Sequence, residues 1–418
     1  MNANVLEKLK ILAESAKYDV SCASSGTSRG HKAGAIGSAA GWGICHSFAE
    51  DGRCISLLKI MLTNYCRYDC AYCINRRSND IPRATLSVTE LVNLTIEFYR
   101  RNYIEGLFLS SGVVRNPDYT MERLVRIVKD LRTIHRFNGY IHLKGIPGAS
   151  PELIHEAGLY ADRMSVNIEI PNEKSLQTLA PEKDFQSVFT PMRHIQQGVL
   201  ESAEERKKYR SAPRFAPAGQ STQMIIGATP DSDKDILRLS SALYQRPTMK
   251  RVYYSGFVPV NAYDNRLPQL KQPPLVRENR LYQADWLLRF YQFKVDEIVD
   301  DSYPDLDLEI DPKLAWALRH PEKFPVDINR ADYELLLRIP GLGVKSAKMI
   351  IVSRRYGKIN GSQLKKMGVV LKKAQYFITC NELPLQTVQE LRPERVRQLL
   401  IPHKGKQEDP RQLKIIFE

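Results

Sequence analysis

The residues best suited to chemistry in this sequence are cysteines, six of which lie within the first 73 residues. Cys66, Cys70 and Cys73 form a C-x3-C-x2-C loop within the segment MLTNYCRYDCAYCINRR. Thiolates select zinc or iron–sulfur centres, but a structural zinc ion needs a fourth ligand, and the next histidine is His135. Three cysteines instead suit a four-iron cluster whose fourth iron stays open to a substrate or cofactor. The polar character of the loop argues against three buried thiols that act only as small apolar groups.

The other cysteines leave two interpretations open. Cys22, Cys45 and Cys54 either build a second iron–sulfur cluster, with His46 or Cys380 as the fourth ligand, or are ordinary buried thiols. A disulfide scaffold is disfavoured because the seven cysteines are few and unevenly placed.

The elements that position the cysteine loop follow from an alternation of short apolar runs with amphipathic stretches. Strands are expected at 55–62, 106–109, 140–144, 163–168, 223–227 and 252–257, and helices at 88–101 and 121–136. This pattern predicts an α/β fold with a partial (β/α)6 parallel barrel, whose functional groups lie beyond the carboxyl ends of the strands. We expect an N-terminal helix and Gly/Ser-rich extension over 1–50, the barrel over 51–300 and a basic C-terminal domain over 301–418. Residues 300–311 carry six acids in twelve residues and are expected to form a solvated connector.

The cysteine loop, with Tyr72 before the last cysteine and its position after the first strand, resembles the radical S-adenosylmethionine (SAM) superfamily. The resemblance implies a [4Fe-4S] cluster on Cys66, Cys70 and Cys73, and SAM bound to the open iron. Reductive cleavage of SAM would then give a 5'-deoxyadenosyl radical. It also implies an electron donor such as flavodoxin or ferredoxin.

Further residues match the places where the superfamily contacts SAM. Ser110, Ser111 and Gly112 occupy the position of its Gly-Gly-Glu motif, and this chain has no glutamate there. The predicted cofactor-binding residues are Tyr72, Ser110, Ser111, Gly112, Lys144, Asn167, Glu169 and Gly227. Two alternatives stay open: Lys144 as a solvated strand end, and Ser165, Asn167 and Glu169 as side chains that bond only to one another. No residue is assigned to catalysis on the substrate.

The positive charge is concentrated near the C-terminus. The whole chain carries +14, and residues 320–418 hold 19 Lys and Arg against 10 Asp and Glu. Residues 335–381 contain ten basic residues and no acid. One-signed charge over such a length is typical of a protein that binds a phosphate backbone.

The segment VDINRADYELLLRIPGLGVKSAKMIIVSRR begins before that stretch and continues into it. It resembles the helix-hairpin-helix module, expected over about 325–375, which binds DNA without sequence preference. Gly341 and Gly343 would let the backbone approach a phosphate, and the N–H groups that open the second helix would bind it. Lys345 and Lys348 would add charge. We therefore expect an all-α C-terminal domain, while a hairpin used only for packing is the alternative.

Composition limits the remaining classes. With 43% hydrophobic and 26% charged residues the chain can bury a core, which excludes a wholly disordered protein. No apolar run approaches the roughly 20 residues of a spanning helix, and the first residues lack a signal-peptide apolar region. We expect a cytoplasmic protein without a membrane partner.

Together the two halves predict a radical SAM enzyme that acts on nucleic acid. KYDVSCASSG, EGLFLSSGV and IHLKGIPGAS further resemble the radical SAM family of DNA modification and repair proteins, which implies DNA as partner. Two alternatives stay open: an RNA-modifying (tRNA or rRNA) radical SAM enzyme, and a DNA-binding protein whose cluster senses redox state.

Overall fold

The computed structural model describes residues 3–17, 43–48, 54–383 and 388–401. The chain divides into two compact units, the first comprising Met1–Asp231 with Ala242–Pro274, and the second Ser232–Ser241 with Leu275–Glu418. The main division between the two units therefore falls at residue 275, whereas the sequence predicts that the C-terminal domain begins at residue 301. That domain boundary stays a prediction.

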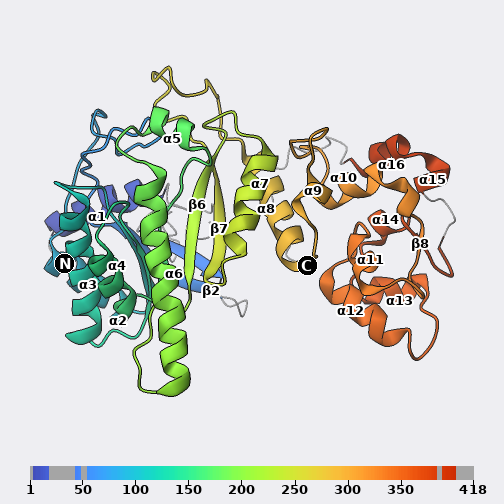
Figure 1. The fold of residues 1–418 in the computed structure, drawn as a ribbon, viewed down its shortest axis with the longest axis horizontal. Helices are drawn as coiled ribbons and strands as arrows, with labels where there is room; N and C mark the ends of the chain where they lie inside the picture. Colours follow the sequence, from blue (N-terminus) through green and yellow to red (C-terminus); the bar gives the residue numbers. More distant parts are fainter. Residues whose placement is uncertain (1–2, 18–42, 49–53, 384–387, 402–418) are drawn as a thin grey trace, which may run out of the picture. The chain divides into compact units, whose positions relative to one another are not determined.

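The first unit is built on a seven-stranded sheet of order β1-β2-β3-β4-β5-β6-β7. β1 is antiparallel to β2, and the six strands from β2 to β7 are parallel. The strands are β1 Ile44–Phe48, β2 Cys54–Met61, β3 Gly106–Ser110, β4 Tyr140–Lys144, β5 Arg163–Ser165, β6 Gln220–Ile226 and β7 Met249–Gly256. The expected α/β fold with six parallel strands is thus confirmed as a curled, open sheet (Figure 1).

Helices connect successive strands. In the first unit they are α1 Ala3–Ala16, α2 Val88–Arg100, α3 Pro117–Thr133, α4 Pro151–Tyr160, α5 Glu173–Leu179 and α6 Phe185–Lys208. Neighbouring helices α2, α3, α4 and α6 pack side by side along the sheet (Figure 1). Their starts follow from local sequence: at α2, the Ser87 hydroxyl accepts the N–H of Glu90 at 3.1 Å, and the Glu90 carboxylate accepts the N–H of Ser87 at 2.7 Å.

The fourth parallel strand, β5, is shorter than the expected range 163–168. Its ladder ends at Ser165, and the chain returns to the sheet only through an isolated bridge between Glu169 and Met224. Between these points the Thr222 hydroxyl accepts the N–H of Ile168 at 3.1 Å and donates to the carbonyl of Val166 at 2.8 Å, so a side chain replaces ladder bonds. Glu169, just past the predicted strand, has a φ of +65°, in the left-handed region. The interruption lies at the carboxyl ends of the parallel strands.

The second unit is mostly helical. Its helices are α7 Asp233–Tyr244, whose last three residues belong to the first unit, α8 Leu275–Phe290, α9 Val295–Ile298, α10 Pro312–Arg319, η1 Pro321–Lys323, α11 Tyr333–Arg338, α12 Val344–Ser353, α13 Gly361–Lys366, α14 Leu371–Ala374, α15 Val388–Leu391 and α16 Pro393–Leu400. The buried rings of Trp316, Phe324 and Phe377 form its aromatic core.

Two expectations for this unit need correction. It is not all-α, because β8 Val326–Asp327 and β9 Ile378–Thr379 form a short parallel pair beside the aromatic core. The acidic segment 300–311 looked like a solvated connector, yet its carboxylates bind basic side chains of the same unit. Asp311 pairs with Lys373 at 2.8 Å and Glu309 with Arg397 at 2.7 Å. Ion pairs therefore hold the segment 300–311 against other parts of the second unit.

Among the described residues, no helix is both long and apolar enough to span a lipid bilayer.

Candidate active site

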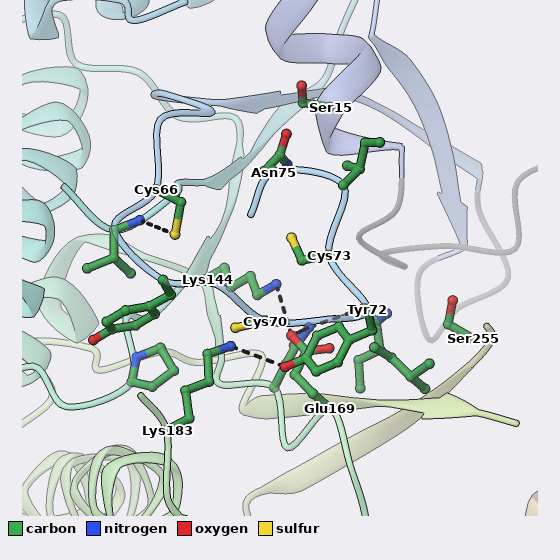
Figure 2. A pocket seen from close by; sticks show the side chains of 18 of the residues that line it. Ser15, Cys66, Cys70, Tyr72, Cys73, Asn75, Lys144, Glu169, Lys183 and Ser255 are labelled. Carbon is green, nitrogen blue, oxygen red and sulfur yellow. Dashed lines mark hydrogen bonds and ion pairs between the residues drawn. The ribbon is translucent and has the colours of Figure 1, made fainter. Parts of the chain in front are cut away.

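The three cysteines of the loop after β2 meet in one pocket of the first unit. Cys70 is buried, Cys66 and Cys73 are half-buried, and all three are free thiols. Their sulfur atoms point toward a common space (Figure 2), inside a pocket whose volume of about 1150 Å³ includes open solvent.

Backbone contacts hold the cysteine loop in place. The N–H of Ala71 donates to the carbonyl of Leu179 at 2.7 Å. The buried amide of Asn261, from the segment after β7, donates to the carbonyls of Ala71 at 2.7 Å and Cys73 at 3.0 Å. On the β3 side, the N–H of Val113 points at the sulfur of Cys66 at 3.5 Å. The loop is thus fixed from several elements of the sheet.

A charge clamp adds to this support. The Arg76 guanidinium, only 7% exposed, donates twice to Asp69 at 3.0 Å and once to Asp264 at 2.6 Å. Arg266 binds the other side of Asp264, also at 2.6 Å. Hydrogen bonds from Arg76 and Ser78 lower the pKa of Asp69 to about 2, against the opposing effect of burial. The clamp joins the loop to a segment almost 190 residues away.

The donor set fits a four-iron cluster better than a single metal ion. Among the described residues, no group of three or more His, Cys, Asp or Glu side chains could hold one metal ion. A four-iron cluster does not require such convergence, because each cysteine binds a different iron. The described residues that line the pocket include no histidine and no further cysteine. One iron would therefore lack a thiolate or imidazole ligand from the described lining.

Burial favours the protonated form of Cys70 and Cys73 when no metal is bound. It raises the pKa of the Cys70 thiol, and raises that of Cys73 to about 12. A metal centre must displace these protons, so cluster binding should release protons.

Most of the predicted SAM-contact residues lie on the wall of the same pocket. These are Tyr72, Ser111, Gly112, Lys144, Asn167 and Glu169. Gly112 packs so tightly on the cysteine loop that a Cβ would lie 2.3 Å from the carbonyl oxygen of Tyr65. The structure thus brings together residues from the ends of four elements, and their individual roles stay predictions.

Glu169 is the central carboxylate of this wall. It forms an ion pair with Lys144 at 3.7 Å, and one oxygen accepts the amide of Asn167 at 3.2 Å. The amide of Asn167 also reaches Gln223 at 3.2 Å. A left-handed backbone at a glutamate is strained, and such strain concentrates at functional sites. Because Lys144 is largely buried and paired with Glu169, it is not simply a solvated strand end.

Two predicted cofactor residues are not in the pocket wall. Ser110 is 1% exposed within β3 and does not contribute to the pocket lining. Gly227 has a φ of +84°, and a Cβ there would meet Pro274 at 2.9 Å. The backbone and packing alone require glycine at position 227.

Sequence reasoning missed several pocket residues, of which Lys183 and Gln223 are the most informative. Lys183 lies before α6, and its amine is 3.4 Å from the hydroxyl of Tyr72 (Figure 2). Burial lowers the pKa of Lys183, but the charges of Cys70 and Tyr72 outweigh it and hold the pKa well above its ordinary value. No local sequence pattern could have predicted that Lys183 lies in the pocket. Gln223 could have been predicted, because the period of two in β6 places it on the same face as Ile225, which also lines the pocket.

The second-cluster hypothesis stays a prediction. Cys22 and the side chains of Cys54 and His46 lie outside what the structure describes. Cys45 is half-buried on β1. Cys380 belongs to the second unit, where its thiol donates to the carbonyl of Ile359 at 3.2 Å.

In the second unit, the predicted nucleic-acid-binding residues surround the turn between α11 and α12. Gly341 has a φ of +80°, and a Cβ there would lie 2.7 Å from the carbonyl oxygen of Val370. Gly343 is the N-cap of α12 and supplies no side-chain cap. Lys345 and Lys348 are exposed on the first turns of the helix.

Comparison with known proteins gives the class of the first unit. Residues 60–211 match the family model of the Radical SAM superfamily. This match identifies a radical SAM domain within the chain. Radical SAM enzymes use a [4Fe-4S] cluster and SAM and commonly need an electron donor. No curated protein matches the chain.

Three solved structures illustrate the likeness. They are HydG, a maturase of the [FeFe]-hydrogenase (16% identity, 46% of this chain and 50% of that chain, TM-score 0.32), methylornithine synthase PylB (14%, 55% and 61%, 0.40), and a radical SAM methyltransferase from Sphaerobacter thermophilus (14%, 57% and 69%, 0.38). The chain spans half the length of HydG. These similarities are low, so the assignment rests on the family match.

Proposed function

We propose that this protein is a radical SAM enzyme that acts on nucleic acid, in DNA modification or repair. In this proposal Cys66, Cys70 and Cys73 hold the cluster, and Lys144, Asn167 and Glu169 orient SAM. When bound, the reduced cluster and SAM supply a carbon radical that abstracts hydrogen from the substrate.

The chain's own residues prepare the pocket for such chemistry. Glu169 offers a carboxylate to a cationic group, while Lys144 beside it offers an amine to an anionic one. The amino acid head group of SAM carries both charges, so this pair matches its ammonium and carboxylate groups. Apolar side chains of Met61, Ile146 and Phe257 line other parts of the wall and keep water away from a reactive intermediate.

The observation that carries the nucleic acid target is the exposed charge of the second unit. Of the ten basic residues in 335–381, three have partners inside the unit: Arg338 pairs with Glu297, Lys373 with Asp311, and Arg354 binds backbone carbonyls. The other seven are exposed and form no ion pair with a described residue: Lys345, Lys348, Arg355, Lys358, Lys365, Lys366 and Lys372. A run of exposed basic residues with no acid between them attracts a polyanion.

The turn before α12 would contact the phosphate backbone. Gly341 is half-buried and Gly343 is buried. The first N–H groups of α12 lack carbonyl partners within the helix and would bind the phosphate. Contacts of this kind recognise backbone and carry no sequence information. A base must then be unpaired or flipped from the duplex to enter the cluster pocket.

The deciding experiment measures 5'-deoxyadenosine formed by the anaerobically reconstituted full chain with dithionite and SAM. Duplex DNA, single-stranded DNA and tRNA are added in separate reactions, with Cys73→Ala as the inactive control. We expect one nucleic acid to increase the yield; a yield highest with tRNA would assign the RNA alternative. No deoxyadenosine under any condition would exclude turnover and leave the redox-sensing alternative.

Binding provides the second measurement. The double variant Lys345→Gln/Lys348→Gln should reduce the slope of log affinity against log salt by roughly two, since each lost phosphate contact contributes about 0.9. The matched control changes two exposed lysines of the first unit, Lys10→Gln/Lys271→Gln, and should leave the slope unchanged. Equal slopes in all three proteins would contradict the assigned binding surface.

A further inference from the structure

Helix α12 exposes three large apolar side chains in a unit whose other large apolar groups are mostly buried. Met349 is 38% exposed, Val352 53% and Tyr356 89%. The spacing of three and four residues places them on one side of the helix. Tyr356 continues that side beyond the helix end, because its N–H donates to the carbonyl of Ser353 at 3.0 Å. The opposite side, with Ala347 and Ile350, is buried in the unit.

Basic residues share this exposed side. Lys345, Lys348 and Arg355 are exposed and occupy positions three or four residues from the apolar group. We call the six residues Lys345, Lys348, Met349, Val352, Arg355 and Tyr356 the α12 face. No acid occurs between residues 335 and 381, so nothing within that stretch neutralises its charge.

The mixture of groups decides between possible partners. Phosphate contacts alone require only charge, and give no reason to expose a tyrosine and two aliphatic side chains. Protein interfaces favour tyrosine, methionine and arginine but are depleted in lysine. The two lysines of the α12 face, in a stretch without acids, therefore favour an anionic partner. Cations beside an exposed aromatic ring are the combination that binds unpaired nucleotides, with the ring stacked on a base and the cations on phosphates.

We propose that the α12 face binds unpaired nucleotides, with Tyr356 stacked on a base and Met349 and Val352 against neighbouring bases or sugars. This inference rests on the proposed function and narrows its substrate class to single-stranded nucleic acid or a duplex with an unpaired segment. Such a substrate already presents bases outside the stack, which lowers the cost of bringing one into a closed pocket.

The test compares affinities of the full chain for three fluorescent oligonucleotides of equal length at one salt concentration: a single strand, a perfect duplex, and a duplex with a central mismatched bubble. We expect Tyr356→Ala to weaken binding of the single strand and bubble about ten-fold, and duplex binding by less than two-fold. Tyr356→Phe keeps the ring and should keep the affinity. Tyr103→Ala, at a tyrosine 51% exposed in the first unit, is the matched control.

The outcomes separate this inference from the function on which it rests. If wild-type protein binds no nucleic acid, the proposed function fails. If it binds, but Tyr356→Ala weakens all three oligonucleotides equally or none, the α12 face does not read unpaired bases and the inference is overturned. A Tyr356→Ala variant that changes only self-association in sedimentation, or only binding to anionic vesicles, overturns it in the same way.

Discussion

Replacing Arg76 by methionine tests whether the charge clamp holds the cysteine loop. Removing one partner of a buried ion pair costs about 3–5 kcal/mol of unfolding free energy, because the remaining charge stays buried. Two features place the cost near the lower end. Asp264 keeps its bonds to Arg266, and Asp69 keeps Ser78 as a donor. We therefore expect a loss of about 3 kcal/mol.

We expect Arg76→Met to affect cluster binding more strongly than protein stability, because Asp69 is adjacent to Cys70 and the clamp fixes the loop that carries the cysteines. We expect Arg76→Met to bind fewer than half of the four irons of a reconstituted cluster. Arg76→Lys offers one point charge instead of a fork, so it should lie between Arg76→Met and wild type in both stability and iron content.

The assays are urea unfolding followed by circular dichroism, and iron and sulfide determined per chain after anaerobic reconstitution. Arg193→Met, at an exposed arginine of α6, is the control and should change stability by less than about 0.5 kcal/mol. If Arg76→Met unfolds at the wild-type urea concentration and retains four irons, the clamp does not position the loop.

Three further predictions address the pocket and its support. Glu169→Gln should keep the iron content but weaken SAM binding roughly ten-fold in calorimetry, because it removes a charged acceptor; unchanged affinity would contradict the assigned contact. Lys183→Met removes a cation beside Cys70, so the cluster's midpoint potential should become more negative in redox titrations followed by EPR. Hydrogen bonds from Arg266 lower the pKa of Asp264, so the stability it contributes is present above its unfolded pKa and is lost as pH falls toward its folded pKa. Asp264→Asn should therefore flatten the acid limb of stability against pH.

The sequence predicted those parts of the fold that depend on local pattern. The strand Tyr140–Lys144 was predicted to the residue, because its apolar run is bounded by Asn-Gly and Gly-Ile-Pro-Gly. The end of β5 was not, because the Thr222 hydroxyl replaces ladder bonds at Val166 and Ile168, and Thr222 is more than 50 residues away in sequence. The acidic segment 300–311 was misjudged for a related reason: its partners, such as Lys373, are distant in sequence.

The residues of the candidate site also fall into those that a local sequence pattern predicted and those that it did not. Cys66, Cys70 and Cys73 are close in sequence, so their spacing alone revealed the cluster ligands. Lys183 approaches the pocket from the segment before α6, and only the folded sheet brings it to Tyr72. Side chains that complete a site from distant segments leave no periodic signal in the sequence.

The same distance implies an order of assembly. Asn261 and Asp264 hold the cysteine loop from the segment after β7, the last strand of the sheet. Contacts separated by almost 190 residues form only when the intervening chain has folded. Closing so long a loop costs conformational entropy, which the contact energy offsets only after the loop has closed. The loop therefore reaches its final geometry only when β7 has joined the sheet. Iron should bind tightly to the folded first unit and weakly to a chain ending after β6, although that chain retains all three cysteines.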